Sequence, residues 1–201
     1  MHRGYVWAGV GLILSGLALA VGMWFTEAGG PWPGTGPGPA TLEAAADLVR
    51  QELARWGYTD LAPKEVMEFT NHFYVLVVER DTGKGAMELI VERDGFVHPE
   101  PGPNMMWNTK YGHMGGMMGP GSGAWPETPP LSRDRARQLA QEFLRSTLPG
   151  AEPDEGTEFY GYFTFDVEQG GRLFGMLSVN AYTGQVWYHS WHGAFVRETE
   201  L

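Results

Sequence analysis

The chain has 201 residues, which is long enough for one or two domains. Its hydrophobic content of 43% and aromatic content of 13% suffice for a packed core, so a wholly disordered chain is excluded. The net charge of −10 and the lack of any basic run argue against nucleic acid as a partner. Because there is no cysteine, disulfides, thiolate zinc sites, cysteine nucleophiles and covalently attached haem are excluded.

The N-terminal segment predicts a single membrane anchor. Residues 5–25 carry no charged side chain, and a helix of that length is about 30 Å long, enough to cross a bilayer core. Trp7 and Trp24 lie near its two ends, and Arg3 is the only charged residue before it. We therefore expect a single-pass protein of the cell membrane with its body outside the cytoplasm. The alternative is a cleaved signal peptide, for which residues 26–28 form a poor cleavage site.

The body has the same order of elements twice. Each half begins with a segment whose apolar residues have helical spacing. Segments in which apolar and polar residues alternate, as in strands, follow it, and glycine-rich turns separate them. The first half predicts a helix over 41–56 and strands near 65–70, 73–80, 87–92 and 96–98. The second half predicts a helix after Ser132 and strands over 157–167, 172–181 and 185–191. An internal duplication accounts for this order most simply.

The sequence LSVNAYTGQVWY at residues 177–188 resembles the terminal hairpin of the PepSY domain family. The first half departs from that pattern, because Arg93-Asp94-Gly95 stands where the second half has its Thr-Gly turn. The resemblance implies a small α+β fold with one helix across a curved antiparallel sheet. It also implies an interaction or inhibitory module, and it implies no catalytic residues.

We therefore predict an α+β fold in which an N-terminal transmembrane helix precedes two tandem helix-plus-antiparallel-sheet units of the PepSY-like kind. The predicted parts are an anchor at 1–28, a Gly/Pro linker at 29–40, a first unit at 41–103, a Met/Gly/His-rich loop at 104–130 and a second unit at 131–201.

The loop between the two units predicts a site for a soft metal ion. Residues 104–119 hold five of the ten methionines, and four glycines interrupt any helical or strand period. Thioether and imidazole groups suit Cu(I) or Ag(I). The predicted ligands are Met105, Met106, His113, Met114, Met117 and Met118, with His98 as an auxiliary ligand. The alternative is that the methionines fill a gap or contact a partner protein.

His189 and His192 have the spacing of a metal pair, but a strand over 185–191 would point residues three apart to opposite faces. Only a bulge or the end of the strand would bring both rings to one ion. We therefore interpret each as a histidine within an aromatic surface, and His72 as structural.

No motif of a nucleotide-binding loop, a serine hydrolase or a zinc protease occurs, so we predict a protein that is not an enzyme. Two hypotheses remain. One is a membrane-anchored accessory protein that binds Cu(I)-like ions through the loop, and the other is a metal-free interaction or regulatory module. Both hypotheses imply a protein partner in the membrane or cell envelope, and neither implies a nucleic-acid partner. A non-covalent haem with His and Met ligands is a further cofactor alternative.

Overall fold

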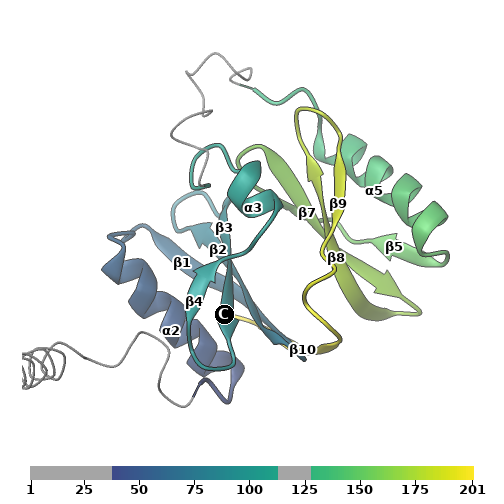
Figure 1. Ribbon diagram of the computed structural model, residues 1–201. Helices are drawn as coiled ribbons and strands as arrows, with labels where there is room; N and C mark the ends of the chain where they lie inside the picture. The colour runs from purple at the N-terminus through teal and green to yellow at the C-terminus, as the bar shows by residue number, and fades with distance from the viewer. Residues whose placement is uncertain (1–37, 113–127) are drawn as a thin grey trace, which may run out of the picture. The chain divides into compact units, whose positions relative to one another are not determined.

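The computed structural model describes residues 38–112 and 128–201 (Figure 1). The predicted anchor over 5–25 and most of the predicted Gly/Pro linker lie outside these residues. Four of the predicted loop ligands, His113, Met114, Met117 and Met118, also lie outside them.

The first half begins with helix α2, Leu42–Arg55, which matches the helix predicted over 41–56. Thr41 caps its N-terminus, because the Ala44 amide donates to the Thr41 Oγ1 at 3.1 Å. Gly57 follows its C-terminus with φ of 85°, a conformation that glycine adopts without strain. One face of the helix is buried through Leu42, Ala45, Ala46, Val49 and Leu53.

The first sheet has the strand order β10-β1-β2-β3-β4, and every pair is antiparallel. Its strands are β1 Leu61–Phe69, β2 His72–Glu79, β3 Gly85–Glu92, β4 Val97–Pro99 and β10 Phe195–Glu200. Strand β2 is buried along its whole length, as its apolar, β-branched sequence predicts. The short helix α3, Pro103–Met106, follows β4.

The second half begins with helix α5, Arg133–Thr147, capped by Ser132. It packs against a second antiparallel sheet of order β5-β7-β8-β9, in which β6 pairs with β7. The strands are β5 Ala151–Pro153, β6 Thr157–Glu158, β7 Tyr162–Gln169, β8 Arg172–Asn180 and β9 Val186–Tyr188.

Each sheet buries both of its faces. In the first sheet, Val75 and Leu89 lie in the core shared with α2, whereas Tyr74 and Leu76 lie in a second core. That second core also contains Tyr162 and Met176 from the other sheet, so the two sheets pack on each other. Helix α2 therefore lies against the first sheet and α5 against the second, with an inter-sheet layer between them (Figure 1).

The predicted fold class is wrong. The described residues are mostly antiparallel sheet with few helices, and among them no helix is long and apolar enough to span a membrane. The two predicted units are also not a simple tandem, because β10, from the C-terminal end, forms an edge of the first sheet. Sequence reasoning missed β10 because its exposed, charged residues lack the apolar alternation of a half-buried strand.

Candidate metal centre

Glu100 lies directly after β4 and is fully buried. Its backbone N–H donates to the Glu88 carbonyl at 2.8 Å, which continues the pairing of β4 with β3 by one residue. Gly102 then turns the chain into α3 with φ of 81°. The backbone thus directs a carboxylate into the interior, where burial is unfavourable unless a cation or several hydrogen bonds compensate.

His189 and His192 lie just beyond β9, which ends at Tyr188. The His189 amide still donates to the Met176 carbonyl at 2.9 Å, and the chain then leaves the sheet. Gly193, with φ of 83°, allows the turn that leads towards β10. Because the strand has ended, the alternation of side chains no longer separates the two rings, and both are buried next to Glu100.

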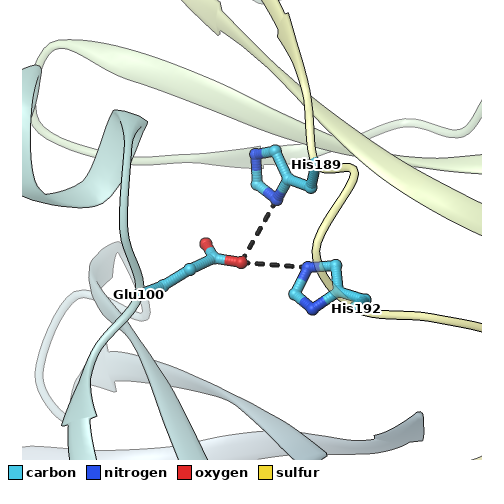
Figure 2. A group of neighbouring side chains, drawn as sticks. All are labelled: Glu100, His189 and His192. Atoms are coloured by element: carbon cyan, nitrogen blue, oxygen red, sulfur yellow. Dashed lines mark ion pairs between the residues drawn. The ribbon is translucent and has the colours of Figure 1, made fainter. Parts of the chain in front are cut away.

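The three side chains converge on one point (Figure 2). The Glu100 Oε1 lies 3.2 Å from the His189 Nδ1 and 2.9 Å from the His192 Nε2. These contacts are short enough for ion pairs, but His189 Nδ1, His192 Nε2 and Glu100 Oε2 all lack a hydrogen-bond partner of suitable geometry. One ligand atom from each residue lies within 4.8 Å of the other two, so the three residues could hold a metal ion.

The far nitrogen of each imidazole has its own partner. The His192 Nδ1 lies 2.8 Å from the His72 Nε2. The His189 Nε2 lies 3.0 Å from the Ser178 Oγ, which is 2.8 Å from the Thr164 Oγ1. If His192 binds a metal through Nε2, its Nδ1–H donates to His72, and if His189 binds through Nδ1, its Nε2–H donates to Ser178. Such partners orient histidine ligands in metal sites and fix their tautomers.

Aromatic rings hold the two imidazoles in place. His192 stacks on Phe69 with ring centroids 4.5 Å apart, and His189 stacks on Trp191 with centroids 4.7 Å apart. The Trp191 indole also donates to the Glu100 Oε1 at 3.2 Å. The ligand atoms are therefore positioned by packing before any ion binds, which reduces the entropy lost on binding.

The electrostatics of the centre keep the Glu100 carboxylate ionised. Burial alone would raise the pKa of Glu100, but His189 and His192 outweigh that effect and lower the pKa to about 2. Burial would likewise lower the pKa of His189, but the Glu100 carboxylate raises it. Burial and the neighbouring His192 lower the pKa of His72 to about 4, so His72 is neutral and can accept a hydrogen bond at neutral pH.

A second acidic residue, Glu88, lies in the same inter-sheet layer. It is fully buried, and it accepts hydrogen bonds from the Tyr74 hydroxyl at 2.9 Å and the Tyr162 hydroxyl at 2.8 Å. Burial and the charge of Glu100 raise its pKa to about 7. Both oxygens of Glu88 are thus occupied by tyrosines, which leaves Glu100 as the carboxylate available to an ion.

The residues predicted from sequence as soft-metal ligands lie elsewhere or outside the described part. The His98 Nε2 lies 3.1 Å from the Glu92 Oε1, and its ring lies against Phe96. Met106 is 55% exposed and Met105 is partly buried. His98 therefore contacts Glu92, and it is Glu100, two positions later, that meets His189 and His192.

The structure also brings together Glu65, Asp166 and Glu198, from β1, β7 and β10. Their carboxylates lie within 4.8 Å of one another. Burial and the charge of Glu198 raise the pKa of Glu65 to about 7, and burial together with Asp154 and Glu65 raises the pKa of Asp166 well above its ordinary value. Unlike the buried centre, this cluster lies partly in solvent.

No protein-family model matches the sequence, and neither a curated protein nor a solved structure matches it. The resemblance to the PepSY family therefore stays a prediction. Any account of function rests on the residues described above.

Proposed function

We propose that the protein is a non-enzymatic metal-binding protein that holds one divalent transition-metal ion at Glu100, His189 and His192. The observation that carries this proposal is the convergence of buried ligand atoms that have no hydrogen-bond partner. A native interior rarely leaves buried polar atoms unpaired, and each one costs about 1–3 kcal/mol. An ion at this point would satisfy all three.

The donor set favours Zn²⁺. Imidazole nitrogen and carboxylate oxygen bind zinc at about 2.0–2.2 Å, which places neighbouring tetrahedral ligands roughly 3.3 Å apart. The separations of 3.2 Å and 2.9 Å between Glu100 Oε1 and the two ring nitrogens are close to that value. The other Glu100 oxygen, Oε2, has no hydrogen-bond partner and can complete the coordination.

The enclosure of the centre supports a structural ion over a catalytic one. Catalytic zinc keeps a position open to water or substrate, whereas structural zinc sites are closed. Here the side chains of His189 and Glu100 are 0% exposed and that of His192 is 2% exposed. The ligands also follow strands of different sheets, β4 and β9, so a bound ion would fasten the two sheets together.

Zinc stoichiometry of the full chain tests the proposal. The purified protein is loaded with Zn²⁺, dialysed, and measured by inductively coupled plasma mass spectrometry. We expect one zinc ion per chain in the wild type and a loss of most of it in Glu100→Gln and His192→Gln. The matched control is His98→Gln, which removes a histidine that contacts Glu92 and should retain the ion.

Circular dichroism shows whether each variant is folded, and His189→Asn provides a third ligand change if one of the others is unfolded. Equal zinc content in folded ligand variants and in the control would contradict the proposal.

The methionine loop remains a second candidate metal site. The observation that favours it is Met106, a large apolar side chain that is 55% exposed. A thioether binds Cu(I) far better than Zn²⁺, so the two sites would not compete for one ion. Anaerobic Cu(I) titration of the wild type and of Met106→Leu tests the loop, with Met176→Leu, a change at a buried methionine, as control. Equal Cu(I) affinity in all three proteins would remove Met106 from the ligand set.

A further inference from the structure

Strand β10 is joined to the proposed metal centre by a very short connection. Only Gly193 and Ala194 lie between His192 and Phe195, the first residue of β10. Phe69 of β1 contacts both ends of this connection, because it stacks on His192 at 4.5 Å and meets the Phe195 ring edge-on at 5.9 Å. The position of His192 therefore sets where β10 begins on the edge of β1.

The connection itself is attached to the turn between β1 and β2. The Thr70 amide donates to the Ala194 carbonyl at 2.9 Å, and the Asn71 side chain donates to the Trp191 carbonyl at 2.9 Å. A Cβ on Gly193 would lie 2.3 Å from the Thr70 Oγ1, so the backbone approaches this turn closely. These contacts are few and partly exposed, and they do not by themselves immobilise the segment.

Beyond these contacts, strand β10 is held by its antiparallel ladder with β1, from Glu65 to Phe69, and by the Leu201 amide, which donates to the Lys64 carbonyl at 2.9 Å. It pairs with β1 along one side only, and most of its residues are exposed or partly exposed. Arg197 forms one ion pair, 2.7 Å from Glu68, on the surface. Glu198 of β10 also lies beside the Glu65 and Asp166 carboxylates. Burial and neighbouring carboxylates raise the pKa of all three groups, so bringing them together on docking costs free energy.

We infer that metal binding at Glu100, His189 and His192 controls whether β10 docks on the edge of β1. This inference rests on the proposed function. When an ion fixes His192, only two residues separate this fixed point from β10. The entropic cost of forming the ladder with β1 is therefore small. Without the ion, residues 189–201 lose the link through the metal to Glu100, which follows β4 of the first sheet.

Release of β10 would uncover β1 as an edge strand. The β1 groups that now pair between Glu65 and Phe69 would become free donors and acceptors. Such an edge accepts an extended segment by strand addition. Metal would then act as a regulator of this edge: the bound form covers it with the chain's own strand, and the metal-free form exposes it.

Hydrogen–deuterium exchange of the full chain, with and without zinc, tests the inference. If β10 opens only after the ion is lost, zinc slows the exchange of residues 196–201. The slowing factor is one plus the ratio of the free zinc concentration to the dissociation constant. At a free zinc concentration 100 times the dissociation constant, exchange is therefore about 100-fold slower. The hairpin turn at residues 81–84, whose side chains are exposed or partly exposed and which contacts no ligand, should exchange at the same rate in both states. His98→Gln should behave like the wild type, and His192→Gln should exchange quickly even with zinc present.

Zinc content is measured on the same samples. Bound zinc together with unchanged exchange of residues 196–201 would overturn the inference and leave the metal centre standing. A wild type that binds no zinc would overturn both.

Discussion

The His72 Nε2 lies 2.8 Å from the His192 Nδ1, and the two residues are 120 positions apart in the sequence. Two imidazole nitrogens at this distance need one proton between them. Because His72 has a pKa lowered to about 4 by burial and by His192, it is neutral at pH 7 and accepts the hydrogen bond. If His192 binds a metal through Nε2, its proton lies on Nδ1 and is donated to His72, and the Nε2 lone pair is left for the ion.

Replacing His72 with phenylalanine should weaken zinc binding by about 10–100-fold, the usual effect of removing a hydrogen-bond partner from a ligand histidine. The variant keeps an aromatic ring of similar size but leaves the His192 Nδ1–H without an acceptor. Competition titration with a zinc chelator measures the change. The control is His98→Phe, on β4, and an affinity loss of equal size in that control would contradict a positioning role for His72.

The carboxylate cluster of β1, β7 and β10 should make the metal-free protein less stable as the pH rises. Glu65 has a pKa raised from 4.5 to about 7 by burial and by Glu198, so between these values the folded state keeps a proton that the unfolded state has lost. The stability from this group is therefore fully present below pH 4.5, falls as the pH rises from 4.5 to 7, and is lost above pH 7. The loss is on the order of 1–3 kcal/mol for this one group.

The variant Glu65→Gln removes this titration and should be more stable than the wild type at pH 8, with a smaller difference at pH 5. Urea unfolding in the presence of a chelator measures both values. Glu152→Gln, which changes an exposed glutamate of β5, is the control and should follow the wild type. A Glu65→Gln protein with the wild-type pH dependence would show that the cluster does not carry this effect.

Leu89 of β3 and Leu177 of β8 are both fully buried, as their alternation predicts, and each lies in the core between its sheet and its helix. Either leucine-to-alanine change should lower the free energy of unfolding by about 2–5 kcal/mol. Phe174→Ala, at a side chain that is 46% exposed, should cost about 1 kcal/mol or less. Chemical denaturation measures the free energy of unfolding of the three variants. A leucine variant that is as stable as Phe174→Ala would contradict the assigned cores.

Much of the secondary structure follows from local patterns. Helices α2 and α5 are bounded by capping residues and have buried apolar faces, and the central strands have the apolar, β-branched sequence of buried strands. Local patterns do not predict the pairing of β10 with β1, because the register between strands that are distant in the sequence depends on tertiary contacts. The packing of the two sheets through Tyr74, Tyr162 and Met176 is non-local in the same way.

The cluster of Glu100, His189 and His192 was missed for two physical reasons. Strand alternation argued against His189 and His192 as a pair, but β9 ends at Tyr188, which is one of the two circumstances that allow both rings to meet. Glu100 stands between two prolines and resembles a solvated loop carboxylate in the sequence. The available signal was the histidine pair itself, directly after a strand and directly before the glycine turn at Gly193.

Zinc X-ray absorption spectroscopy of the loaded full chain tests the central claim most directly. The account predicts nitrogen and oxygen scatterers at about 2.0–2.2 Å, with the outer-shell pattern of two imidazole rings. The same spectrum of His192→Gln should lose one imidazole contribution or the bound zinc altogether. A wild-type spectrum dominated by sulfur at about 2.3 Å, or one without imidazole, would contradict a metal centre at Glu100, His189 and His192.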